Sequence, residues 1–504
     1  MHGRDQNSTC AGCSTTIGTH RYERYFDLKV VTSQNVDMNI VDTRSGSPFV
    51  YGVTQTEPAS LMVPNEAPVS SPEPPTSEPR VQQAQSTADS MNNEAEIRPP
   101  FTAMAPSFLP DLPPPYRSLL DYFTRVANSF SCNEVVKRDL YATFMPMATQ
   151  KSHVMASMLS LAAIHRANAG LVQSPKQLAL LQTVAVKQLR AKVSESSGYP
   201  TEDIMATVLM LCYSDIVAGG DKANSWRLHL EGAASLFARD VSSWTKNSPN
   251  STRRFIARCF ISLVALANVS GQPPREVVSN QALQMLDIGS HEFIDEFTAY
   301  SSELVDIFVQ IGALIKNGCQ ISYQTGSRYS IHSHFESTRL IQQIRAMLDM
   351  EQKTLDTSAL SASFSSIREE YLKINESYHQ AALLHVYQRI QRLPAAADEI
   401  QDAVNRILTL VSGVRLLQGP CPGIVLLFPL FSAGCGAIKP DDRQQVRSLL
   451  QGMAKMFGIN TVQQSLKVLE AIWSHRDVNG DSESSPVWET LVGKKHDPLL
   501  LRGK

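Results

Sequence analysis

The chain has 504 residues, of which 43% are hydrophobic and 19% charged, and its formal net charge is −2. This hydrophobic content is enough for a large buried core and excludes a chain that is disordered throughout. The balanced charge excludes a protein that coats nucleic acid through bulk positive charge, so any DNA contact requires a local basic module. We expect no signal peptide and no membrane span, because Met1 is followed by polar residues and the apolar runs are far shorter than about 20 residues.

The N-terminal part divides into two zones. Residues 1–56 lack sustained periodicity and predict a poorly structured arm. Residues 57–115 hold half of the chain's 28 prolines and more acidic than basic side chains. Because proline blocks helices and removes backbone donors, we predict a disordered acidic linker there.

The eight cysteines indicate a reducing compartment, because six of them stand singly among apolar residues. Cys10 and Cys13 form a C-x-x-C pair, and two thiolates at this spacing supply half of a structural zinc site. The next cysteine, Cys132, lies beyond the linker. We expect a plain polar tail here, with an incomplete zinc-site remnant as the alternative. No cofactor is predicted, and zinc binding would need ligands from sequence that this chain does not contain.

Residues 116–504 carry the periodicity of α-helices and predict one large all-α domain, with two helical subdomains sharing an interface as the alternative. The first helix has apolar residues at i, i+4, i+7 and i+11 from Leu119. The next helices are expected after Ser152, Pro175 and Thr201, and the last of these ends near Gly219. Further helices are predicted over residues 224–239, 251–268, 294–316, 335–350, 364–393, 396–414, 423–437, 440–457 and 461–474. Loops are predicted over residues 271–292, 317–334 and 351–363.

The search for catalytic signatures gives no phosphate-binding loop, zinc-protease motif or nucleophile elbow. Asp441 and Asp442 resemble the start of the aspartate-rich motif of helical prenyl-diphosphate enzymes, but a third carboxylate is missing. Their place after Pro440 favours two acids at a helix N-terminus. We therefore predict that the protein is not an enzyme, with an isoprenoid-type helical enzyme as the remote alternative.

Two other groups of ligand-type residues favour ordinary roles. Asp477, Asn479 and Asp481 begin like a calcium loop but lack its later glycine and glutamate, which favours a turn. His332 and His334 lie in a polar stretch with no other ligand nearby, which favours surface histidines.

A four-residue cluster is expected on one side of the helix predicted over residues 224–239. The i, i+3, i+4 and i+7 spacing brings together Trp226, His229, Leu230 and Ala233. Its composition favours a packed structural cluster anchored by Trp226 over a ligand site.

Several stretches carry a family resemblance through their order along the chain. Residues 203–213 (DIMATVLMLCY) precede the pattern W-x-x-H-L-x-G-A, and residues 424–434 (IVLLFPLFSAG) follow much later. The residues that these motifs single out are Trp226, His229, Gly232, Ala233, Phe428, Pro429 and Gly434. Together with residues 119–123 and 153–165, they resemble the regulatory domain of fungal-specific transcription factors, the all-helical domain that accompanies Zn2Cys6 binuclear clusters. The resemblance covers residues ~117–502.

The resemblance implies a nuclear regulator of transcription that controls a metabolic or secondary-metabolite biosynthetic pathway. Its partners would be the transcription machinery or another regulator, with DNA contact through six cysteines and two zinc ions, commonly in a homodimer. This sequence offers only Cys10 and Cys13 of that head, and the six residues after Cys13 are uncharged. Three interpretations stay open: a regulator without the cluster, a co-regulator or scaffold that binds another transcription factor without touching DNA, and a truncated gene model.

Overall fold

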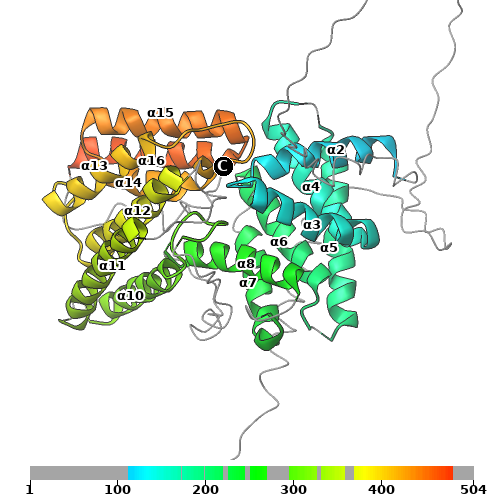
Figure 1. Cartoon of the computed structure of the whole chain (residues 1–504), viewed down its shortest axis with the longest axis horizontal. Coiled ribbons are helices and arrows are strands. Elements are labelled where there is room, and N and C mark those ends of the chain that lie inside the picture. The colour runs from blue at the N-terminus through cyan, green and yellow to red at the C-terminus, as the bar shows by residue number, and fades with distance from the viewer. Residues whose placement is uncertain are drawn as a thin grey trace, which may run out of the picture. The chain divides into compact units, whose positions relative to one another are not determined.

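The computed structural model describes residues 112–171, 173–197, 199–219, 225–244, 250–269, 294–325, 331–357 and 368–480 (Figure 1). From Pro113 onward these residues belong to one compact unit. The arm predicted over residues 1–56 and nearly all of the linker predicted over residues 57–115 lie outside the described residues.

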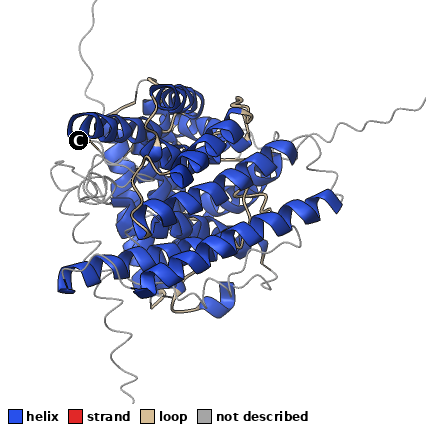
Figure 2. Cartoon of the chain, turned by 90° about the vertical axis from the view of Figure 1, so that its left-hand side faces the viewer, coloured by secondary structure: helices blue, strands red, loops and turns tan. Residues whose placement is uncertain are grey.

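The described residues contain fourteen α-helices and no named strand, which confirms the prediction of an all-α domain (Figure 2). The first seven are α2 (Pro114–Asn128), α3 (Glu134–Gln150), α4 (Ser152–Asn168), α5 (Pro175–Glu195), α6 (Glu202–Ala218), α7 (Ser225–Phe237) and α8 (Ser251–Val269). The others are α10 (Leu304–Thr325), α11 (Ile331–Thr357), α12 (Arg368–His385), α13 (Asp398–Ser412), α14 (Leu427–Gly436), α15 (Pro440–Phe457) and α16 (Asn460–Asn479). Shorter helical turns are η2 (Val241–Trp244), η4 (Val386–Ile390) and η5 (Pro422–Leu426). No helix among the described residues combines the length and apolar character that a membrane span requires.

Helices α4 and α6 form the centre of the N-terminal half of the domain (Figure 1). Every residue of α4 from His153 to His165 is buried, because α2, α3, α5 and α6 all pack against this helix. Its sequence, rich in alanine, serine and aliphatic residues, has no polar face to turn toward solvent. A helix that is apolar all round belongs in the interior of a large core.

A polar pair of a buried histidine and a half-buried aspartate joins the starts of these two central helices. His153 Nε2 lies 3.2 Å from Asp203 Oδ2, and Thr201 donates a hydrogen bond to Asp203 Oδ1 over 2.6 Å. Burial works to raise the pKa of the Asp203 carboxyl, but the hydrogen bonds from His153 and Thr201 outweigh it and hold the pKa well below its usual range. Asp203 is therefore charged in the fold at neutral pH. Thr201 precedes α6 as expected, although its hydroxyl binds Asp203 rather than a backbone N–H.

Helix α12 forms the centre of the C-terminal half, where it packs against α11, α13 and α14 (Figure 1). Its last turn passes into the π-helical turn η4, a widened turn that often occurs at functional places. Tyr378 of α12 stacks on Tyr300 with a centroid separation of 4.3 Å and lies 5.4 Å from the ring of Phe428. The aromatic cluster ties α12 to α14 and to the chain before α10.

The C-terminal end of α6 is satisfied by side chains from two other helices. Asn168 of α4 donates to the carbonyl oxygen of Val217 over 2.7 Å, and Asn460 of α16 donates to that of Ala218 over 3.0 Å. Thr461 also donates to the carbonyl oxygen of Ile216. The last carbonyls of a helix have no partner within it, so these bonds fix α16 against α6.

Helix α3 was not among the helices predicted from the sequence. Pro146 lies inside it, and a proline in a periodic pattern normally indicates a helix end. Tertiary packing offsets the backbone hydrogen bond that Pro146 removes from the helix. Helix α3 lies against α4 and α8 and buries Phe144, whose ring centroid is 6.2 Å from that of Phe255. Asn133 begins the helix by accepting a hydrogen bond from the Val136 N–H over 2.8 Å.

Several predicted boundaries were wrong. The loop predicted over residues 317–334 is largely the end of α10 and the start of α11, and α11 continues into the loop predicted over residues 351–363. Residues 294–303 form a turn rather than the start of a helix. Ser152 is the first residue of α4, and its hydroxyl donates to Gln188 over 2.6 Å instead of capping the helix. The loops were predicted from the polar composition of these stretches, but the exposed side of a long surface helix is as polar as a loop.

Candidate functional site

A pocket of about 420 Å³ lies between α11, α12 and α13. Helix α12 supplies half of its lining, and the other two helices supply the opposite walls. The lining residues are Leu348, Glu351, Glu369, Leu372, Lys373, Asn375, Glu376, Arg406, Thr409 and Leu410. A concave space with apolar walls and a few polar groups is the usual form of a small-molecule site.

Two ion pairs lie among the more exposed lining residues, at the rim of this pocket. Arg406 Nε and Nη2 donate to the two carboxylate oxygens of Glu376 over 2.5 and 2.8 Å. Lys373 Nζ lies 3.0 Å from a carboxylate oxygen of Glu369. The hydrogen bond with Glu376 raises the pKa of Arg406. Both cations of the rim are therefore already neutralised by neighbouring carboxylates.

The floor of the pocket is formed by Glu351 and Asn375, which make a buried polar triad with His379, a residue that does not itself line the pocket. Asn375 Nδ2 donates to Glu351 Oε2 over 2.6 Å, and His379 Nε2 lies 3.7 Å from Glu351 Oε1. The three residues are 3%, 2% and 0% exposed. His379 Nδ1 lies 2.9 Å from the backbone oxygen of Asn375, which can only accept, so Nδ1 carries a proton.

Residues 294–303, which we call the 294–303 turn, are held by side chains from several helices. Arg258 of α8 donates to both carboxylate oxygens of Asp295 over 2.8 and 2.9 Å, and Asp295 is only 3% exposed. Burial by itself would lower the pKa of the Arg258 guanidinium. The charge of the Asp295 carboxylate and its hydrogen bonds act in the opposite direction, and the net result is a raised pKa. Asp295 Oδ1 also accepts from the N–H groups of Phe297 and Thr298, so the carboxylate organises the turn from within.

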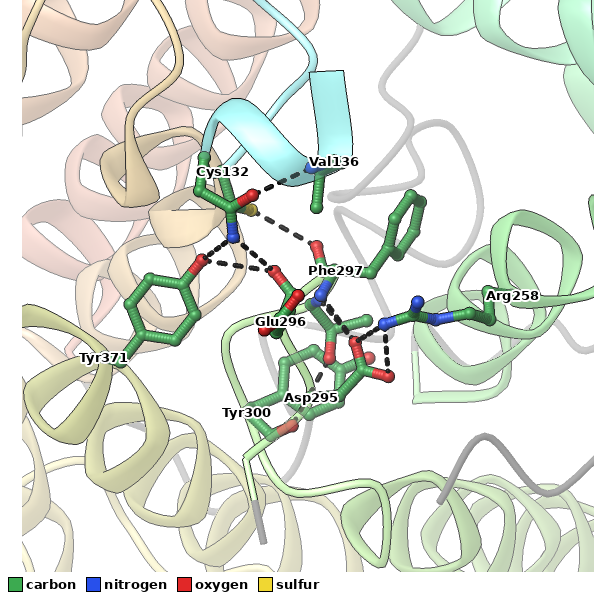
Figure 3. A network of polar contacts seen from close by, with 10 residues as sticks. Cys132, Val136, Arg258, Asp295, Glu296, Phe297, Tyr300 and Tyr371 are labelled. Atoms are coloured by element: carbon green, nitrogen blue, oxygen red, sulfur yellow. Dashed lines mark hydrogen bonds and ion pairs between the residues drawn. The ribbon is translucent and has the colours of Figure 1, made fainter. Parts of the chain in front are cut away.

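The other side of the turn is bound by the start of α3 and by α12. Figure 3 shows Arg258 and Tyr371 reaching the turn from opposite sides. Asn133 Nδ2 donates to the Tyr371 hydroxyl over 2.8 Å, and this hydroxyl donates to the carbonyl oxygen of Glu296 over 3.1 Å. The Cys132 thiol donates to the carbonyl oxygen of Phe297 over 3.2 Å. Burial raises the pKa of both Tyr371 and Cys132, so both keep the protons that make these bonds.

Asn375 connects the pocket floor to the 294–303 turn. Its Oδ1 accepts the N–H of Ser301 over 2.8 Å, while its Nδ2 donates to Glu351. Ser301 is only 1% exposed, so no solvent replaces this bond. One amide side chain therefore links the Glu351 carboxylate to a turn that contacts the start of α3, α8 and α12.

Residues 118–501 match the family model of the fungal-specific transcription factor domain. The chain belongs to this family. It is therefore a fungal transcription regulator, which acts with DNA or with other factors. No curated protein and no solved structure matches it significantly. The pocket and the 294–303 turn both lie within this transcription factor domain.

The structure buries the first predicted motif of the transcription factor domain in α7. Trp226 is 3% exposed, His229 is fully buried, and Gly232 and Ala233 are also buried. His229 Nε2 lies 3.4 Å from Asp215 Oδ2, and the Trp226 backbone oxygen accepts from the thiol of Cys212 over 3.5 Å. These contacts run to α6, and none of these residues lines the pocket.

The second predicted motif lies in α14 and is equally buried. The Phe428 ring stacks on that of His385 with an interplanar angle of 1°, and Pro429 occupies the first turn, where its missing N–H costs nothing. A Cβ atom on Gly434 would lie 2.6 Å from a methyl carbon of Leu469. The Gly434 backbone oxygen also accepts from Trp473 Nε1 over 2.8 Å. Glycine is needed there for the close approach of α14 and α16.

The predicted metal-type residues are not brought together in the part of the chain that the structure covers. Cys10 and Cys13 lie outside it, and among the described residues no group of three or more His, Cys, Asp or Glu side chains could hold a metal ion. Five described cysteines are buried without a disulfide, and burial raises the pKa of Cys259 to about 12, so this thiol is no thiolate ligand.

The other candidate residues lie at helix ends or on helix surfaces. Asp441 and Asp442 occupy the first turn of α15, as their position after Pro440 predicts. The turn predicted around Asp477 and Asn479 was wrong, because both residues belong to α16, and Asp481 lies outside the described residues. Asp477 pairs with Arg443 over 2.8 Å. His334 is exposed on α11, whereas the His332 side chain lies outside the described ones.

Sequence reasoning missed the whole pocket. Glu351 was assigned to a loop, and Asn375 and His379 fall inside a helix with no motif around them. A usable indication was present in α12, where Asn375 and His379 are four residues apart on a face that otherwise carries Tyr371 and Tyr378. Polar residues on the buried face of a helix are expected to have a structural or functional partner.

Proposed function

We propose that this regulator controls a metabolic or secondary-metabolite biosynthetic pathway, and that its helical domain reads an effector in the pocket between α11, α12 and α13. The observation that carries the proposal is Asn375, which joins the buried floor of the pocket to the 294–303 turn. An effector that binds one packing arrangement better than another shifts the population toward it. The protein works in the nucleus by binding, without catalysing a reaction.

A reporter assay tests this function. A promoter regulated by the full chain is measured in cells that carry the wild-type chain, a deletion of residues 1–115, or Asn375→Ala. Loss of regulation in the Asn375→Ala strain, at unchanged protein level, supports a role for the helical domain. Unchanged activity after deletion of residues 1–115 removes the acidic linker from the mechanism, whereas unchanged activity of Asn375→Ala removes the pocket.

A second function is favoured by the incomplete cysteine set of the N-terminal arm. With Cys10 and Cys13 as its two candidate thiolates, the arm has a third of the ligands that a binuclear cluster uses. In this alternative the protein is a co-regulator that binds another transcription factor and does not touch DNA. Chromatin immunoprecipitation in strains with and without candidate zinc-cluster partners separates the two. Promoter occupancy that survives loss of every partner rules out the co-regulator.

A further inference from the structure

We propose that the pocket between α11, α12 and α13 takes a small organic cation, an amine or guanidinium with an apolar body, whose charged head pairs with Glu351. The inference deepens the proposed function, because it names the chemical class of the effector. Three observations support it: the charge balance of the lining residues, the incomplete hydrogen bonding of Glu351 and the apolar character of the walls.

The charge balance of the pocket leaves one carboxylate, that of Glu351, with which no lysine or arginine of the described residues pairs. Its ionisable neighbour is His379, whose Nε2 lies 3.7 Å from Glu351 Oε1. The lining contains three carboxylates, Glu351, Glu369 and Glu376, and two cations, Lys373 and Arg406. Each cation is engaged at the rim, Lys373 with Glu369 and Arg406 with both oxygens of Glu376. The carboxylate that remains is the buried one, where the attraction to an added positive charge is screened least, although binding there must also offset the desolvation of both charges.

The hydrogen bonding of Glu351 is also incomplete. A carboxylate has about four acceptor positions. Among the described residues, Glu351 accepts one hydrogen bond, from the neutral amide of Asn375. His379 Nε2 lies 3.7 Å away, beyond hydrogen-bonding distance, and this buried nitrogen has no hydrogen-bond partner in the described structure. A ligand N–H donor at the floor would fill acceptor positions of Glu351 that the described residues leave open.

The shape and polarity of the walls define the rest of the ligand. Leu348, Leu372 and Leu410 give apolar contact on all three helices, and the volume of about 420 Å³ accommodates a ring with a short chain. An anionic head would face Glu351 at the floor. It would find the guanidinium of Arg406 already engaged by Glu376. The pocket therefore favours amines and disfavours acids.

The experiment uses the full chain and three probes that share one apolar body: 4-phenylbutylamine, 4-phenylbutanol and 4-phenylbutyrate. Affinities are measured by calorimetry and by ligand-observed NMR at neutral pH. We expect the amine to bind at least about tenfold more tightly than the alcohol, and the acid more weakly than both. Equal affinities, or tighter binding of the acid, would overturn the inference without any variant.

Two charge-matched variants locate the binding. Glu351→Gln keeps an oxygen that can accept from Asn375 and removes the charge at the floor. Glu399→Gln removes the same charge from an exposed side chain in the first turn of α13, outside the pocket lining. We expect Glu351→Gln to reduce amine affinity at least about tenfold and Glu399→Gln to change it less than about twofold. Equal losses in both variants would show binding by net charge alone and would refute the site.

A second readout follows the ligand through Asn375. The Ser301 amide, whose N–H binds Asn375 Oδ1, is expected to change its hydrogen-exchange rate when the amine binds, and to stay constant in Glu351→Gln. The reporter assay keeps the failures apart. Selective amine binding with no effect on any promoter would uphold the ligand class and refute the proposed function. A promoter that depends on Asn375, combined with no preference for the amine, would uphold the proposed function and refute the ligand class.

Discussion

Replacing Asn375 with aspartate exchanges the side-chain NH2 group for an oxygen, so the group that donates a hydrogen bond to Glu351 becomes an acceptor. The new carboxylate could still accept the N–H of Ser301, but the nitrogen that lies 2.6 Å from Glu351 Oε2 would become an oxygen. Two carboxylates in a site that is almost closed to solvent cannot both be charged, so the pair holds one proton. The aspartate variant therefore folds normally only with a bound proton.

The size of the effect comes from the cost of holding that proton. The shared proton raises the folded-state pKa above the unfolded value, which is about 4 for either carboxyl. Stability is then complete below about pH 4 and falls as the pH rises toward the folded-state pKa, by about 1.4 kcal/mol per pH unit. At pH 7 the loss is at most about 4 kcal/mol, which is large against the whole stability of a typical domain.

Urea unfolding of the full chain at pH 5 and pH 7.5 measures this effect. Asn375→Asp should lose stability relative to the wild type, and the loss should grow between the two pH values. Asn405→Asp, an exposed amide on α13, is the matched control and should change stability by less than about 0.5 kcal/mol at either pH. The reasoning fails if the Asn375→Asp difference is the same at both pH values or shrinks as the pH rises.

Three further predictions concern the core. Trp226→Ala should cost about 3–5 kcal/mol of unfolding free energy, since the ring is 3% exposed, and a loss below about 0.5 kcal/mol would contradict its burial. Gly434→Ala should cost about 1–3 kcal/mol of unfolding free energy in urea, because the new Cβ meets the fully buried side chain of Leu469, which has no room to move. Gly452→Ala is the matched control and should be close to neutral, because the nearest atom to its new Cβ lies at 3.3 Å. Asp203→Asn should cost about 1–2 kcal/mol at pH 6. Because the folded-state pKa of Asp203 is lowered, this difference should shrink progressively as the pH falls below about 4 and vanish only below the folded-state pKa; a constant difference in acid titrations would refute it.

The buried network around the 294–303 turn could not be predicted from the sequence, because its parts come from distant segments. Asn133 and Arg258 stand more than a hundred residues apart, and Tyr371 stands more than a hundred beyond Arg258. Each looks like an ordinary helix residue, and the segment 294–303 itself was predicted to be helical. Asp295 overrides that tendency, because its carboxylate binds two backbone N–H groups of the turn and the Arg258 guanidinium together.

The sequence by itself determined the all-α class and the order of most helices, because apolar spacing along one chain encodes which face of each helix is buried. The order of the motifs along the chain, and not this spacing, indicated the family. The sequence also indicated a packed position for Trp226, whose side chain is 3% exposed. Tertiary structure decided the rest. Helix α3 persists through Pro146 because its neighbours pack around it, and the carboxylate of Glu351 lies at the floor of a pocket because α11, α12 and α13 converge there. Such a site depends on contacts between helices far apart in the chain, and the periodicity of a single helix contains no record of them.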